Sequence, residues 1–264
     1  MENKQYRVFS YICLIALLIF GISCGKPDLR KEFISATGIL LIYKNSQFLG
    51  NCTTVAYERN QNKYKFFTAA HCVSEYKPET SETVFQNVDL AIILEKQNGD
   101  RQIHHAKILA IGELKNFDDF VILEVETDKY IPIVSFGQFD PKFNENVAIV
   151  TSPVGVEFGS VFLKGYVSKE KINNKLVNNS GVNLQGAFGM QIIGLGSAQG
   201  TSGSGVFSLE SNAVVGIVHG SIANERGHST IIAIPIFKFN DFDKKYEFER
   251  VSPFVKSELR CTPD

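Results

Sequence analysis

The chain of 264 residues carries 27 Lys and Arg against 28 Asp and Glu, a net charge of −1, and 44% of its residues are hydrophobic. This balance, without a Lys- or Arg-rich run, argues against nucleic acid as a partner. The length suits one or two domains with substantial hydrophobic cores.

The first 23 residues have the pattern of a signal peptide. A short basic start precedes an uncharged apolar run over residues 8–23, which is too short for a confident transmembrane span. Cys24 follows a small residue at the end of this run. The arrangement resembles a bacterial lipoprotein signal, although Gly21 stands where Leu or Val is usual. We expect export to the bacterial cell envelope, a lipid anchor on Cys24 and a polar tether over residues 24–33. Ordinary cleavage with release to the periplasm or medium, and an uncleaved anchor, are the alternatives.

Short apolar runs separated by turn residues follow from residue 34, which predicts an all-β protein. A turn signal at Asn98 and Gly99 predicts a hairpin over residues 91–111. About a dozen runs without a long helical pattern fit a pair of small barrels. Residues 238–260, rich in charge and Phe, predict a short C-terminal helix packed on the second barrel. The predicted strands are 37–43, 52–57, 64–69, 91–96, 105–111, 120–125, 147–151, 159–168, 188–193, 205–209, 213–219 and 230–235.

Two sequence motifs indicate nucleophilic catalysis. The first is Thr68-Ala69-Ala70-His71-Cys72, and the second is Gly200-Thr201-Ser202-Gly203-Ser204-Gly205. A serine hydroxyl is a poor nucleophile near neutral pH and needs a base, together with a group that orients the base. With an acidic residue between them, in the order His, Asp, Ser, these motifs resemble the chymotrypsin-like (trypsin-like) serine proteases over most of the chain.

The resemblance implies a fold and a function. The fold is all-β, with two six-stranded antiparallel β-barrels: one over residues 34–135 carries His and Asp, and one within residues 136–264 carries Ser and ends in the helix. The function is that of an exported serine endopeptidase that cleaves protein or peptide substrates through an acyl-enzyme intermediate. No cofactor is implied. The sequence shows no His-Glu-x-x-His motif and no close Cys/His quartet, so no metal site is predicted.

Three aspartates precede apolar runs and compete for the orienting role: Asp89, Asp118 and Asp119. Asp89 lies 18 residues after His71, too few for the strands that the family places between them. Asp119 lies 48 residues after His71 and leaves room for the hairpin. Asp119 also abuts its apolar run as in the family, whereas Asp118 would turn its side chain to the other face. We predict Asp119, with Asp118 and then Asp89 as alternatives.

Ser202 is the predicted nucleophile and His71 the predicted base. The glycines around Ser202 allow a tight turn and close approach to substrate, and the resemblance assigns the amides of Gly200 and Ser202 to an oxyanion hole. Ser204 would be the nucleophile only in a shifted register, for which the next strand follows too soon. Thr201 replaces the aspartate that pairs with a freed N-terminus in digestive and clotting relatives, so activation by that route is not expected.

The resemblance also implies a disulfide between Cys52 and Cys72, which suits an oxidising compartment. If Cys24 is lipidated, Cys261 stays single; otherwise these two cysteines are a possible second pair.

The sequence contains few indications of which substrate residue is preferred next to the scissile bond. Gly196 stands six residues before Ser202, so cleavage after Lys or Arg, which an aspartate there would favour, is not supported. Val218, His219 and Gly220 resemble the strand that lines the substrate pocket and binds the peptide backbone. A histidine in this strand is similar to glutamate-specific bacterial relatives, one residue out of register, which gives the hypothesis of a Glu or Asp preference.

Two other functions compete. One is a catalytically inactive protease homologue that acts as a surface binding lipoprotein. An occluded cleft or a distorted oxyanion loop would favour this alternative. The other is a quality-control protease with a separate peptide-binding domain, which we do not expect because too few residues follow residue 240.

Overall fold

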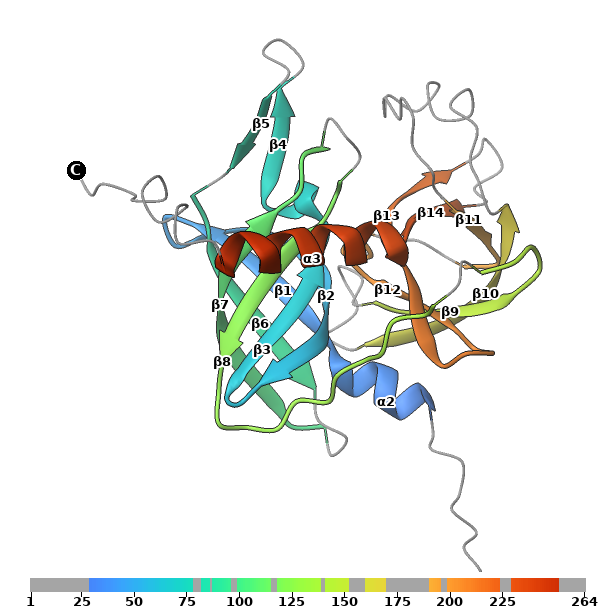
Figure 1. Ribbon diagram of the computed structural model, residues 1–264, viewed down its shortest axis with the longest axis horizontal. Coiled ribbons are helices and arrows are strands. Elements are labelled where there is room, and N and C mark those ends of the chain that lie inside the picture. The colour runs from blue at the N-terminus through green and yellow to red at the C-terminus, as the bar shows by residue number, and fades with distance from the viewer. Residues whose placement is uncertain are drawn as a thin grey trace, which may run out of the picture.

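The computed structural model describes residues 29–77, 82–85, 87–95, 99–114, 118–138, 141–151, 160–169, 190–195, 199–223 and 229–251. The predicted signal peptide, Cys24, Gly196 and Cys261 lie outside these residues. Within the described part, two closed six-stranded antiparallel barrels lie side by side, which confirms the predicted fold class (Figure 1).

The first barrel has the strand order β1-β2-β3-β8-β7-β6. Asn45 and Ser46 join its first two strands with positive φ values of 50° and 65°, the conformation that two-residue hairpin turns require. The predicted 91–111 hairpin is present as the antiparallel pair β6 and β7. The barrel strands are β1 (Thr37–Lys44), β2 (Gln47–Asn60), β3 (Lys63–Thr68), β6 (Asp89–Glu95), β7 (Arg101–Ile111) and β8 (Val121–Glu126), and the separate two-stranded sheet is β4 (Ser74–Lys77) with β5 (Glu82–Phe85).

The second barrel has the strand order β10-β11-β14-β13-β12-β9. Its interior is a buried aliphatic cluster around Ile149, Ile192, Val206 and Val215, as expected for inward-facing residues of a small barrel. The barrel strands are β9 (Asn146–Thr151), β10 (Val161–Lys169), β11 (Met190–Ile193), β12 (Gly205–Ser208), β13 (Ala213–Ala223) and β14 (Ser229–Pro235).

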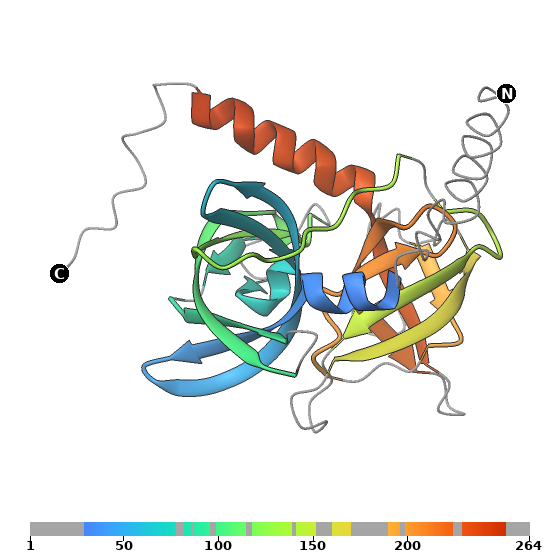
Figure 2. The same cartoon turned by 90° about the horizontal axis from the view of Figure 1, so that it is seen from below.

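An N-terminal helix belongs to the fold. Helix α2 (Leu29–Ala36) lies at the junction of the two barrels (Figure 2). Its Phe33 is buried and stacks on Phe207 of β12, with the ring centroids 4.0 Å apart. The predicted tether over residues 24–33 therefore ends in a buried residue of the core, while residues 30–32 are exposed.

The predicted C-terminal helix is present as α3 (Ile236–Val251); it contacts β13 and β14 of the second barrel, as predicted, and it packs on the first barrel as well. It leaves β14 and runs back across the first barrel (Figures 1 and 2). The ring centroid of Phe239 lies 5.3 Å from the ring centroid of Tyr57 and 5.6 Å from the ring centroids of Phe67 and Phe120. Asp243 accepts a hydrogen bond of 2.9 Å from the Tyr57 hydroxyl. The helix thus joins the barrels.

One hydrophobic cluster continues from barrel to barrel. It contains Val55 and Phe67 of the first barrel, Phe207 and Val214 of the second, and Phe239 of α3, all fully buried. Burying one such large apolar side chain stabilises a fold by about 1.5–3 kcal/mol, so this cluster fixes the relative position of the two barrels. In the described part of the chain, no helix has the length and apolar character needed to cross a bilayer.

Candidate active site

His71 is held at the end of β3 by a rigid short turn. It lies in the single-turn helix η1 (Ala70–Cys72), which begins at the second of two fully buried alanines, Ala69 and Ala70. The predicted disulfide is present: Cys72 is bonded to Cys52 of β2, with their Cα atoms 6.4 Å apart. The small side chains of Ala69 and Ala70 let the turn pack tightly against the barrel, and the disulfide ties its far end. As a result the His71 ring, 35% exposed, projects from a fixed backbone.

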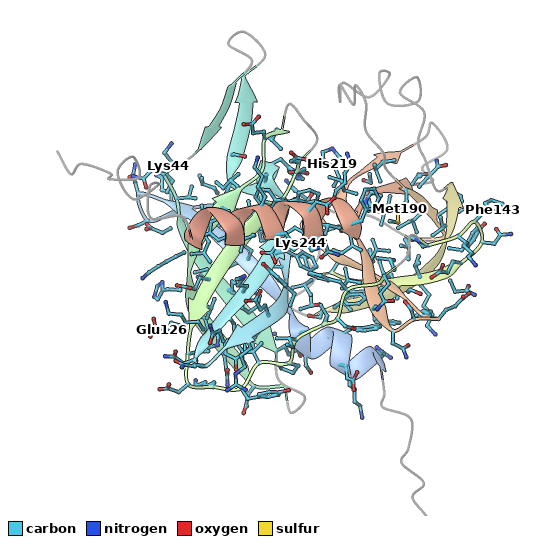
Figure 3. All side chains as sticks on the ribbon, in the orientation of Figure 1. Lys44, Glu126, Phe143, Met190, His219 and Lys244 are labelled. Atoms are coloured by element: carbon cyan, nitrogen blue, oxygen red, sulfur yellow. A yellow bond between two sulfur atoms is a disulfide. The ribbon has the colours of Figure 1, made fainter. Side chains whose placement is uncertain are left out.

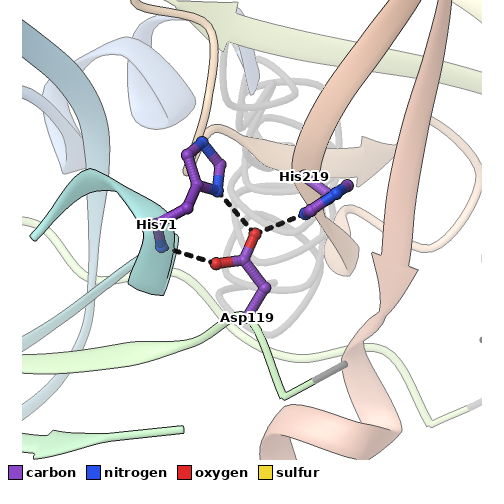
Figure 4. Close-up of side chains that lie close together, drawn as sticks. All are labelled: His71, Asp119 and His219. Atoms are coloured by element: carbon purple, nitrogen blue, oxygen red, sulfur yellow. Dashed lines mark hydrogen bonds and ion pairs between the residues drawn. The ribbon is translucent and has the colours of Figure 1, made fainter. Parts of the chain in front are cut away.

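Asp119 is the acidic residue that the fold brings to His71. It lies two residues before the start of β8, and its side chain is 1% exposed. The Oδ1 atom accepts the backbone N–H of His71 at 2.8 Å, and Oδ2 lies 2.7 Å from His71 Nδ1 (Figure 4). Oδ2 also lies 2.5 Å from Nδ1 of His219, which comes from β13 of the second barrel.

The two alternative aspartates lie elsewhere. Asp89 is an exposed residue at the start of β6 and pairs in register with Tyr43. Asp118 is partly buried, and burial raises the pKa of its carboxyl group, with Lys238 and Lys245 opposing and Glu113 reinforcing the shift. Neither carboxylate hydrogen-bonds to a histidine among the described residues.

The electrostatics favour an ionised Asp119. Burial alone would raise the pKa of its carboxyl group, but His71 and His219 together outweigh burial and hold the pKa below its usual range. Burial likewise lowers the pKa of His71, yet the charge of Asp119 and its hydrogen bond raise it by more, so the net shift is upward. An ionised carboxylate only accepts hydrogen bonds, so His71 carries its proton on Nδ1 and leaves Nε2 as a free base.

The loop that carries Ser202 is anchored on the first barrel. The backbone N–H of Thr53 donates to Ser202 O at 2.8 Å, and the Thr53 hydroxyl donates to Gly200 O at 2.8 Å. Gly200 and Gly203 have φ values of +97° and +82°, a region that favours glycine. A Cβ on Gly203 would lie 2.2 Å from Thr68 Oγ1 and 2.3 Å from Thr53 O, so only glycine fits there.

His71 and Ser202 line one pocket of about 650 Å³. Gly200, Thr201 and the disulfide also contribute to its wall. The Ser202 hydroxyl lies 3.5 Å from the carbonyl oxygen of His219. Within the described residues, no protein group accepts a hydrogen bond from the amide of Gly200 or of Ser202. Ser204, the alternative nucleophile, is fully buried away from this pocket, and its hydroxyl has no partner among the described groups.

The three predicted substrate-binding residues differ in their positions. Gly220 lines the pocket, together with Ser221. Val218 is buried in the second barrel, and its backbone N–H and C=O bond to Ser204 O and to the amide of Gly203. His219 is 19% exposed and directs its ring at Asp119.

Two contacts of the site have no signal in the sequence: the one from Thr53 to Gly200 and the one from His219 to Asp119. Thr53 reaches a residue 147 positions away, and His219 reaches one 100 positions away, so no local pattern could reveal either. Among the described His, Cys, Asp and Glu residues, one group has possible metal-ligand atoms within 4.8 Å of one another. It consists of His71, Asp119 and His219. In this group both Nδ1 atoms already hydrogen-bond to the carboxylate.

A family model for a trypsin-like peptidase domain matches residues 52–217, more than half of the chain. The chain belongs to this family. The family is one of serine-type endopeptidases. The matched segment includes the His71 turn, Asp119 and the Ser202 loop. A comparison with curated protein sequences found no match.

Two solved structures share the fold of this trypsin-like peptidase. The serine endoprotease from Yersinia pestis matches with a TM-score of 0.58 and 16% sequence identity over 84% of this chain. The match spans 66% of that protein, slightly less than two thirds. Deg5 matches with a TM-score of 0.59 and 16% identity, over 81% of this chain and 90% of its own.

Proposed function

We propose that this serine protease is an exported endopeptidase in which His71, Asp119 and Ser202 form the catalytic triad. The observation that carries the proposal is the bond of 2.7 Å between His71 Nδ1 and the buried carboxylate of Asp119, beside a pocket that Ser202 shares with His71. His71 and Asp119 come from the first barrel and Ser202 from the second. The pocket wall contains His71 and Ser202, the base and the nucleophile of the proposed acyl transfer.

In the proposed reaction, Ser202 Oγ attacks the carbonyl carbon of the scissile peptide while His71 Nε2 takes the hydroxyl proton. Asp119 keeps the imidazole in the correct tautomer and stabilises the imidazolium. His71 then gives the proton to the leaving amine, which departs and leaves an ester on Ser202. A water molecule, deprotonated by His71, attacks the ester. His71 then returns this proton to Ser202 Oγ as the acid product leaves.

We assign the stabilisation of the negative charge on the tetrahedral intermediate to the amides of Gly200 and Ser202. Two features support this assignment: the positive φ of Gly200, and the absence of a described acceptor for either amide. Loss of one such donor typically costs about 10²–10³ in rate.

Covalent labelling with a fluorophosphonate probe tests the triad. The native protein is expected to react at one residue, while a Ser202→Ala variant and denatured protein do not. A Ser204→Ala variant is the matched control, because that hydroxyl is buried outside the pocket, and it should label normally. Well-folded protein that fails to label would instead favour the inactive homologue that binds a partner on the cell surface.

We also propose export and lipidation at Cys24, on the basis of the apolar run and the cysteine that follows it. In a bacterial host fed a clickable fatty acid, the full chain should incorporate the label, and a Cys24→Ala variant should not. Incorporation that persists in the variant, or that is absent from the exported native protein, would refute the anchor.

A further inference from the structure

Asp119 is shared by two histidines from different barrels. Its Oδ2 lies between Nδ1 of His71 at 2.7 Å and Nδ1 of His219 at 2.5 Å, while Oδ1 is occupied by the backbone N–H of His71 (Figure 4). The two rings are nearly perpendicular, at 80°, with their centroids 5.4 Å apart. Figure 3 places His219 between the two barrels. The catalytic carboxylate is therefore fixed from the second barrel as well as from the first.

We propose that His219 is a positioning residue that holds Asp119 for His71. This inference rests on the proposed triad. Because an ionised carboxylate only accepts hydrogen bonds, His219 presents Nδ1–H to Asp119, as His71 does. The His219 side chain is 19% exposed, so its contact with Asp119 is largely shielded from solvent.

The positioning role follows from the geometry. Because Oδ1 of Asp119 accepts the backbone N–H of His71, Oδ2 is the oxygen that faces the two rings. Catalysis moves the Ser202 proton to His71, and Asp119 stabilises the resulting imidazolium. The bond from His219 keeps Oδ2 in the position from which it does so.

Two variants separate this role from simple packing. His219→Asn keeps a neutral donor, because the asparagine Nδ2 occupies a position similar to that of the histidine Nδ1. His219→Ala removes the donor. We expect kcat to fall about 10- to 100-fold in His219→Ala, as for loss of a hydrogen bond to a charged group, with KM little changed. His219→Asn should restore most of this loss.

Proton NMR provides a readout that simple packing would not change. We expect two strongly deshielded Nδ1–H resonances in the native protein, from His71 and His219, and one in His219→Asn. Circular dichroism checks that each variant is folded.

The outcomes are distinguishable from failure of the triad itself. If the native protein does not label with fluorophosphonate, the proposed function is wrong. If it labels, and kcat of His219→Asn is no higher than that of His219→Ala, the hydrogen-bond donor to Asp119 does not matter and the positioning role is wrong. Full kcat in a folded His219→Ala variant would overturn the positioning role.

Discussion

Replacing Thr53 with valine should slow catalysis while leaving the fold intact. Valine has nearly the same shape as threonine but lacks the hydroxyl that donates to Gly200 O at 2.8 Å. The backbone bond from Thr53 to Ser202 O remains available, so only one contact of the nucleophile loop is lost. The hydroxyl holds the carbonyl end of Gly200, and the amide at the other end of this residue is the proposed oxyanion donor. The substitution therefore tests whether the first barrel shapes the oxyanion loop.

The magnitude follows from burial. Thr53 is fully buried, so the Gly200 carbonyl loses its partner in a site that water does not readily enter. Leaving a buried acceptor unsatisfied costs about 1–3 kcal/mol. If the loop avoids this cost by leaving its catalytic conformation, the penalty appears in the activation barrier, where about 1.4 kcal/mol is a factor of ten. We expect kcat to fall about 5- to 150-fold.

Steady-state kinetics on a peptide substrate, with thermal unfolding in parallel, measures the effect. Thr53→Ser keeps the hydroxyl and is the matched control, which should retain kcat within a few-fold. A Thr53→Val variant with unchanged kcat and a lower Tm would show that the hydroxyl only stabilises the fold, and would refute the reasoning.

Three further outcomes follow from the site. Gly203→Ala should abolish fluorophosphonate labelling, because the new Cβ would lie 2.3 Å from Thr53 O; a labelled, folded variant would contradict the tight packing of this loop. Reduction of the Cys52–Cys72 bond, which closes a loop of 20 residues, should cost about 3 kcal/mol of unfolding free energy in urea titrations. The pKa of Asp119 is lower in the folded than in the unfolded chain, so its contribution to stability is present above about pH 4 and is lost as pH falls further. Urea unfolding should therefore show a steeper loss below that pH for the native protein than for Asp119→Asn, and equal slopes would refute the assignment.

The sequence predicted most of the barrels because their strands are short and clearly bounded by turns. The predicted run 120–125 corresponds to β8 (Val121–Glu126), and 147–151 to β9 (Asn146–Thr151). Spacing also selected Asp119 over Asp89, since strands β6 and β7 must fit between histidine and aspartate. These features are local or depend on chain length, so a single sequence contains them.

Long-range packing was beyond the sequence. The sequence places helix α3 on the second barrel, where it contacts β13 and β14, but it does not show that the buried Phe239 also packs against aromatic rings of the first barrel. The charged residues of segment 24–33 predict a polar tether, whereas Phe33 at its end is buried and stacks on Phe207. In both cases an amphipathic segment needed a partner surface, and composition does not say which surface it will find.

The same limit applies to the site, where the groups that position the proposed triad come from the opposite barrel. Thr53 of the first barrel holds the loop of Ser202, and His219 of the second barrel contacts Asp119. Each contact crosses the junction, so neither barrel alone presents the full arrangement. The cluster around Phe207 and Phe239 sets that junction. Because these bonds have little tolerance in length, packing far from the pocket must control how well the nucleophile, base and acid are aligned.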